Sequence, residues 1–203
     1  FLMKDAYSFD KDQKGLEESY QLMWDAYVEA FDKMGLDYKI VEGDTGSMGG
    51  RMSHEFIALA ETGEGVIFFT EDSDYAATDE KARFKFEPIV EDLKDLELIE
   101  TPNVTTIEEV SEFLAIPSNK FAKVVDLLVK GEPIFVVIPG DRELNEAKLL
   151  SYLKVAEHDV EMMDDETIEK ITGAKAGFTG PKGLEDVRVL VDESITKIYN
   201  VVI

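Results

Sequence analysis

The stretch PIFVVIPGDRELNEAK, residues 133–148, decides the fold class of this chain. Its uncharged part is Pro133 to Gly140, and the core of that part, Ile134 to Ile138, is short and rich in β-branched residues, which is typical of a strand buried on both faces. Asp141 follows Gly140 and is a residue type that caps helices, so a polar helix is predicted from Glu143 to Leu153. A buried strand that runs directly into a helix is common in α/β proteins. We therefore predict a mixed α/β (α+β) fold.

The rest of the chain predicts further helices and strands on either side of a charged, weakly periodic junction at about residues 76–102. Before the junction, the patterns predict a strand at 1–9, an amphipathic helix at 16–34 ended by Gly35, and strands at 38–41, 54–60 and 65–70, the last two paired. After it, they predict a helix with a Thr106–Glu109 capping box, a short helix capped by Ser118, a strand at 124–129, an acidic helix at 165–171 and a strand at 187–191.

The composition excludes several classes of function but does not identify one. The 203 residues suffice for two modest domains, and a net charge of -23, from 44 acidic and 21 basic residues, opposes nonspecific attraction to nucleic acid or an anionic membrane. A bound polyanion must therefore meet a local basic patch. The absence of cysteine excludes disulfides and thiolate zinc sites. Without a signal peptide or an apolar run near the roughly 20 residues that span a bilayer, we expect a cytoplasmic protein and no membrane.

His54 and His158 are the only histidines, so a three-histidine metal site is excluded and no metal ligands are predicted. His158 lies in a polar segment and is expected at the surface. His54 follows a double glycine, where backbone can approach a ligand closely. It is equally well explained, together with Glu55, as a polar group at a sheet edge, and both readings stay open.

Three segments occur in the order and approximate spacing seen in bacterial-type prolyl-tRNA synthetases: FLMKDAYSFD (1–10), GDTGSMGGRMSHEF (43–56) and SDYAA (73–77). The first resembles the end of class II motif 2. This resemblance implies a proline and adenylate pocket that contains Met3, Asp5, Tyr7, His54 and Glu55. It also implies that the full-length synthetase uses ATP and Mg. The ATP-binding arginine and motifs 1 and 3 lie outside the sequence, so we predict that this chain does not activate proline.

The second half resembles the editing domain that this family carries between motifs 2 and 3. The resemblance divides the chain into part of the class II antiparallel catalytic sheet, residues 1–85, and the inserted mixed α/β editing domain, residues 86–203. In the family this domain hydrolyses alanine wrongly attached to proline tRNA, and it needs no cofactor. A Gly-Ala-Asn segment and a histidine that senses the alanine methyl group would lie beyond Ile203, so we expect a C-terminally truncated domain.

The resemblance also assigns site residues to the second half. Lys123 matches the functional lysine of the family, and Lys120 is the alternative because Val124 and Val125 replace the usual threonine and leucine. The GxxxP loop of the family corresponds to Gly177, Phe178, Thr179, Gly180 and Pro181, and a pocket acidic position to Asp192. Taken alone, each of these residues is more simply a surface lysine, an ordinary turn or a polar residue at a strand end.

The implied mechanism uses the acceptor end of proline tRNA itself. A hydroxyl of the terminal adenosine would position water, while loop amides stabilise the oxyanion and Lys123 holds the tRNA end; Lys123 and the loop should therefore converge. A small pocket would accept alanine and exclude proline. The full enzyme is expected to be a homodimer that binds alanine, proline and ATP. Two alternatives are an acceptor-end binding module without hydrolysis, and a structural part that supports the dimer.

Overall fold

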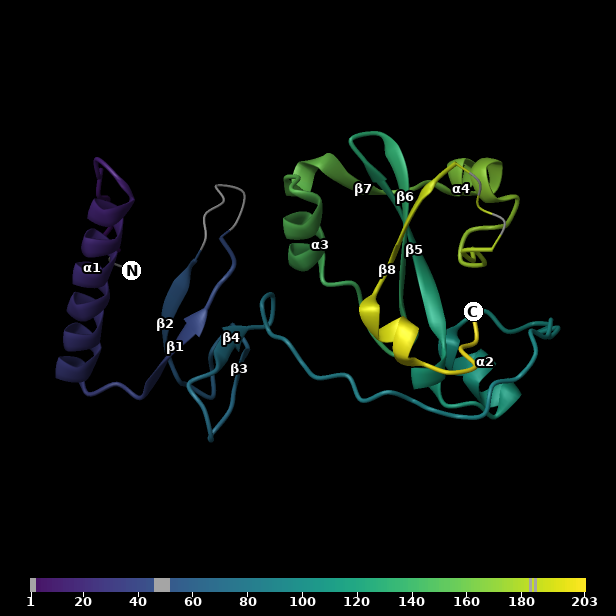
Figure 1. The fold of residues 1–203 in the computed structure, drawn as a ribbon, viewed down its shortest axis with the longest axis horizontal. Coiled ribbons are helices and arrows are strands. Elements are labelled where there is room, and N and C mark those ends of the chain that lie inside the picture. Colours follow the sequence, from purple (N-terminus) through teal and green to yellow (C-terminus); the bar gives the residue numbers. More distant parts are fainter. Residues whose placement is uncertain (1–2, 46–51, 183, 185) are drawn as a thin grey trace. The chain divides into compact units, whose positions relative to one another are not determined.

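The computed structural model describes residues 3–45, 52–182, 184 and 186–203. Phe1, Leu2 and residues 46–51 of the glycine-rich segment lie outside the described residues. The chain forms two compact units: unit 1 contains residues 3–45 and 52–82, and unit 2 begins at Arg83. In the described part of the chain, each unit has one four-stranded sheet of mixed strand direction (Figure 1). The predicted mixed α/β fold is confirmed.

Unit 1 consists of α1 (Gln13–Met34), β1 (Tyr38–Glu42), β2 (His54–Ala58), β3 (Ile67–Phe69) and β4 (Ala76–Thr78). Its strand order is β2-β1-β4-β3, in which β1 and β4 are parallel and the other pairs are antiparallel. Helix α1 begins where the Asp12 side chain accepts a hydrogen bond from the Gly15 amide at 3.0 Å. It ends, as predicted, at Gly35, whose φ of 66° suits glycine.

Two predictions for unit 1 are wrong. The strand expected at residues 1–9 is absent over residues 3–9, which are exposed and irregular; a strand needs a hydrogen-bonded neighbour, and none of the described strands pairs with them. The strands expected at 54–60 and 65–70 do not pair with each other. Strand β2 pairs with β1, and β3 pairs with β4, a short strand that the sequence pattern did not reveal.

Unit 2 contains α2 (Ile107–Leu114), β5 (Ala122–Val129), β6 (Glu132–Pro139), α3 (Glu146–Leu153), β7 (Val160–Met162), α4 (Asp165–Thr172) and β8 (Arg188–Val191), with 3-10 turns η1 (Ser118–Lys120), η2 (Glu157–Asp159) and η3 (Glu193–Lys197). The strand order is β7-β5-β6-β8, with β6 and β8 parallel and the other pairs antiparallel. Lys130 and Gly131, with φ of 54° and 80°, form the tight turn between β5 and β6.

The sheet of unit 2 has two covered faces, because side chains alternate along its strands. One face, called here the α3 face, packs an apolar cluster under α3: Leu127, Val129, Ile134, Val136, Ile138 and Leu149. The opposite face, called the α4 face, packs Phe135 against Met163 and Ile168, and nearer η3 it packs Val137 against Ile195. Figure 1 shows α3 and α4 on opposite sides of the strands.

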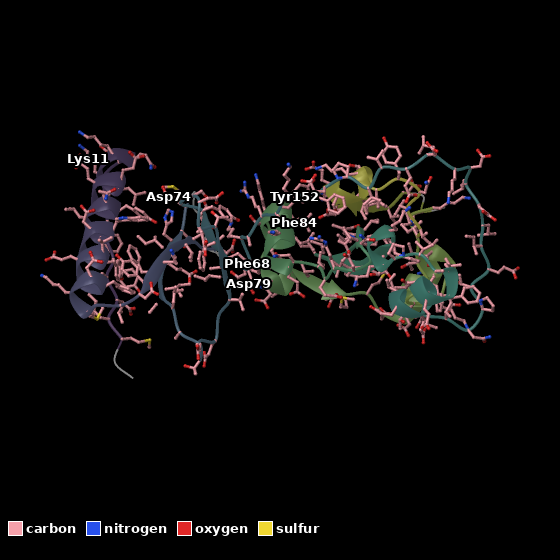
Figure 2. The ribbon with its side chains drawn as sticks, turned by 90° about the horizontal axis from the view of Figure 1, so that it is seen from below. Lys11, Phe68, Asp74, Asp79, Phe84 and Tyr152 are labelled. Atoms are coloured by element: carbon pink, nitrogen blue, oxygen red, sulfur yellow. The ribbon has the colours of Figure 1, made fainter. Side chains whose placement is uncertain are left out.

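The turn after β6 explains why the next helix starts later than predicted. Arg142 donates its amide to the Pro139 carbonyl at 3.1 Å, so Asp141 lies inside a turn, and Asn145 caps α3 by accepting from the Lys148 amide at 3.0 Å. Gly140 is needed in this turn, since a Cβ there would lie 2.7 Å from the Cβ of Phe121. Arg142 stacks over Phe84, which is labelled in Figure 2, with its guanidinium carbon 3.9 Å from the ring centroid.

Two other helix starts predicted for unit 2 agree more closely with the observed ones. The capping box is confirmed: the Glu109 amide donates to Thr106 Oγ1 at 3.2 Å, and the Thr106 amide donates to Glu109 Oε2 at 3.0 Å. Hydrogen bonds from the Thr105 and Thr106 amides hold the pKa of the Glu109 carboxyl below its usual range. Ser118 is the first residue of η1 rather than its cap, a position that Pro117 occupies.

Candidate active site

The GxxxP loop, Gly177 to Pro181, follows α4 and is tied to the sheet through Thr179. Thr179 Oγ1 lies 3.0 Å and 2.9 Å from the two carboxylate oxygens of Asp126 and donates its hydrogen to that group. Gly177 has a φ of 80°, a conformation that favours glycine, and the Phe178 amide donates to the Lys175 carbonyl at 3.0 Å. The loop therefore has a locally fixed turn and one side-chain bond to the α4 face.

Asp126 is the unusual residue of this site, because it is a carboxylate in the middle of a central strand with only 6% of its surface exposed. Its cross-strand partner is Phe135, at the centre of the apolar cluster under α4. Burial raises the pKa of the Asp126 carboxyl, and the hydrogen bond from Thr179 partly offsets that shift. Among the described residues, Thr179 is the only side chain that hydrogen-bonds this carboxylate.

Lys123 lies on the other face of the same strand. Its Nζ is 2.8 Å from Glu143 Oε1, at the edge of the α3 face, and its side chain is 26% exposed. Since β5 pairs with β6 without a bulge, odd-numbered residues such as Lys123 lie opposite to even-numbered ones such as Asp126. The predicted convergence of the lysine with the loop is therefore wrong, because Asp126 holds the loop on the α4 face.

Lys120, the alternative lysine, is mostly buried and makes contacts that stabilise the fold. Its side chain is 11% exposed and forms an ion pair with Glu91. The same carboxylate accepts from Asn200 Nδ2 at 3.2 Å, and the hydrogen bonds from Lys120 and Asn200 lower the pKa of Glu91. Nearby, the Val202 amide donates to the Lys120 carbonyl at 3.0 Å. Lys120 thus fastens the segments around residues 91 and 200 to the start of β5.

Asp192 follows β8 and caps η3. Its Oδ1 accepts from the Ser194 amide at 2.8 Å and from the Ser194 hydroxyl, while its own amide donates to the Val137 carbonyl at 2.9 Å. The structure thus gives Asp192 a local capping role at the end of the strand.

In unit 1, His54 and Glu55 are neighbours on β2. The His54 Nδ1 is 2.7 Å from the Tyr20 hydroxyl, and its ring meets Trp24 edge-on at 5.0 Å between centroids. Burial raises the pKa of Tyr20. Side chains of α1 and β2 line a groove of about 430 Å³: Tyr20, Met23, Trp24, Tyr27, Phe31, His54, Glu55, Phe56 and Ile57.

Met3, Asp5 and Tyr7 lie in the exposed, irregular segment before α1. In the part of the chain that the structure describes, no hydrogen bond or ring contact joins these three residues to His54 or Glu55. The five residues assigned to the proline and adenylate pocket are therefore only partly brought together.

The described residues offer neither a metal site nor a membrane-spanning helix. They contain no group of three or more histidine, aspartate and glutamate side chains arranged to hold a metal ion. None of their helices combines the length and the apolar character that crossing a membrane requires.

Sequence reasoning missed Asp126, although the sequence carries a signal for it. The segment VVDLLV, residues 124–129, places a single charge inside an apolar strand. A buried charge is costly and needs a partner, so such a residue is a candidate for a special role. Its partner, Thr179, lies 53 positions away in the sequence and could not be inferred from local spacing.

Comparison with known proteins places these features in a family. Residues 101–203 match the family described as aminoacyl-tRNA editing domain. The whole chain is 50% identical to a proline–tRNA ligase of Finegoldia magna, and 98% of it is 46% identical to that of Halothermothrix orenii; it spans 35% of the length of each relative. A solved structure described as a putative trans-editing enzyme for prolyl tRNA synthetase matches 48% of this chain and 61% of its own, with a TM-score of 0.43 and 17% identity. The predicted resemblance to prolyl-tRNA synthetases is thus confirmed, and the chain belongs to the aminoacyl-tRNA editing domain family.

Proposed function

We propose that residues 86–203 hydrolyse alanine wrongly attached to proline tRNA, within an enzyme that ligates proline to that tRNA. Residues 1–85 would supply part of its class II catalytic core. The observation that carries the proposal is the editing-domain match over residues 101–203 in a chain that is 50% identical to a proline–tRNA ligase.

The proposed reaction uses water as the nucleophile. The sequence contains no cysteine, and His158 lies on an exposed turn, 86% of its side chain accessible. A hydroxyl of the terminal adenosine positions a water molecule, whose oxygen attacks the ester carbonyl carbon. The amides of Gly177, Thr179 and Gly180 stabilise the oxyanion, whereas that of Phe178 is bonded to the Lys175 carbonyl. The ester C–O bond then breaks, the ribose oxygen takes a proton, and alanine and free tRNA leave.

Lys123 is assigned a role in holding the tRNA end by its phosphate. An ammonium on the α3 face does not share one ester with a loop on the α4 face, so a contact with the reacting carbonyl is not part of the proposal. The partner Glu143 is 91% exposed, and such surface ion pairs contribute little to stability. A phosphate can therefore replace the glutamate at small cost.

The remaining roles concern the complete enzyme. Met3, Asp5, Tyr7, His54 and Glu55 would contribute to the proline and adenylate pocket, ATP and Mg would serve proline activation, and Asp192 would shape the editing pocket by holding η3. The enzyme would act as a cytoplasmic homodimer. Selection of alanine would follow from a small pocket that excludes the proline ring.

The test is deacylation of alanyl and prolyl esters of proline tRNA by this chain. Release of alanine with retention of proline is the expected result. Binding of the acceptor end without hydrolysis would favour the binding module, and neither activity would favour a part that only supports the dimer. Proline-dependent pyrophosphate exchange is the matched control, and the chain should not catalyse it.

Lys123→Ala separates binding from chemistry. The variant should raise the KM for alanyl-tRNA while changing kcat little, because the lysine is assigned to a phosphate and not to the carbonyl. An unchanged KM would contradict the role assigned to Lys123.

A further inference from the structure

The bond between Asp126 and Thr179 joins the candidate catalytic loop to a central strand. The Phe178 amide is bonded to the carbonyl of Lys175, two residues before the loop, and Thr172 Oγ1 bonds the amide and carbonyl of Ala174 at 3.0 Å and 3.3 Å. These local bonds shape the turn but do not fix where it lies over the sheet. In the described part of the chain, Thr179 makes the only hydrogen bond from residues 177–181 to a strand.

The buried carboxylate is well suited to fix that position. Asp126 lies on a central strand between β6 and β7, and its backbone carbonyl accepts from the Met163 amide at 3.0 Å, so its main chain is held on both sides. A carboxylate with 6% exposure has little access to water, so losing its hydroxyl partner leaves it unsatisfied. The pair therefore favours one position of Thr179 over displaced ones.

We propose that Asp126 is a positioning residue for editing: by holding the Thr179 hydroxyl, it places the amides of Gly177, Thr179 and Gly180 where they meet the ester oxyanion. The proposal rests on the proposed function for its effect on hydrolysis. Its structural part, the anchoring of the loop, stands independently. An oxyanion site must be preorganised, so a loop free to shift loses stabilisation of the transition state rather than affinity for the tRNA.

Hydrogen exchange of the Phe178 amide, which is bonded to the Lys175 carbonyl, tests the anchoring in the chain itself. Thr179→Val and Asp126→Leu should each speed exchange about tenfold, because each removes the charge-assisted bond. Thr179→Ser and Asp126→Asn are the conservative controls: the first keeps the hydroxyl donor and the second an acceptor oxygen, and both should exchange within about twofold of the original chain. Thr196→Val, whose hydroxyl bonds the Glu193 carbonyl in η3, should not affect the loop.

A double variant shows whether the two residues act as one. If they do, Thr179→Val combined with Asp126→Leu should speed exchange no more than either change alone. Asp126→Leu also removes the cost of burying a charge, so it should fold even if Thr179→Val lowers stability. Unchanged exchange in both single variants, or additive effects in the double variant, would overturn the anchoring.

Deacylation of alanyl-tRNA tests the catalytic part. Thr179→Val and Asp126→Leu should lower kcat about tenfold or more with KM within about twofold, and the serine and asparagine variants should recover most of the rate. Equal loss in all four variants would contradict a positioning role. If the original chain hydrolyses no alanyl ester, the proposed function and this catalytic role both fail, whereas hydrogen exchange still decides whether Asp126 anchors the loop.

Discussion

The two faces of the unit 2 sheet carry different residues for different purposes. The α3 face is closed by an apolar cluster, and its lysine, Lys123, lies at the edge with an exposed partner. The α4 face has a carboxylate, Asp126, in its interior. A charge there costs stability, so a face built only for packing would hold a leucine or valine at this position. This difference indicates that the α3 face serves packing, whereas the α4 face combines a packed core with a carboxylate that holds the loop.

The largest expected effect comes from truncating the core on each face. Phe135→Ala, at a fully buried site, should lower the free energy of unfolding by about 3–5 kcal/mol, and Leu127→Ala by about 2–4 kcal/mol. Only Phe135→Ala should also speed hydrogen exchange in the loop, since Phe135 lies opposite Asp126. Urea unfolding with hydrogen exchange measures both. Equal loosening of the loop by the two variants would remove the distinction between the faces.

The two lysines give the second contrast. Lys120→Ala should lower the melting temperature by about 5 °C, because it breaks a partly buried ion pair that ties the segments around residues 91 and 200 to β5. Lys123→Ala should change it by about 1 °C or less, since its partner is a surface carboxylate. Thermal unfolding by circular dichroism compares them. A larger loss for Lys123→Ala would show that its pair with Glu143 is structural.

The smallest expected effect is a pH dependence on the α4 face. The pKa of Asp126 is raised in the folded chain, so the protonated form is favoured by folding. The stability that this shift contributes is fully present below the unfolded pKa, near 3.8, and is lost as the pH rises through the raised folded value. Relative to Asp126→Asn, the original chain should therefore gain stability as the pH falls towards 3.8. A difference between them that does not vary with pH would be inconsistent with a buried, shifted carboxyl.

The sequence predicted those parts of the fold that depend on neighbouring residues. Helix α1 with its glycine end, the capping box of α2 and the strand of residues 134–138 follow from local periodicity and cap chemistry. The pairing of strands could not be predicted from local sequence. Strand β3 pairs with β4 and not with β2, and this choice depends on contacts between residues distant in sequence. The sequence also could not predict on which face of the sheet the Lys123 side chain lies, because that face depends on the pairing register of β5 with β6.

We propose that the loop on the α4 face performs the editing reaction, and two of its glycines allow a direct test. A Cβ at Gly177 or Gly180 would meet nothing within 4 Å, so neither substitution causes a clash. Only Gly177 has a positive φ, 80°, which an alanine adopts with strain.

The decisive measurement is the rate of alanyl-tRNA deacylation by Gly177→Ala, with Gly180→Ala as the matched control. We predict that Gly177→Ala lowers kcat about tenfold or more, because the strained turn displaces the loop amides, while Gly180→Ala stays within about threefold of the original chain. Equal rates for the two variants and the original chain would contradict a catalytic role for the loop.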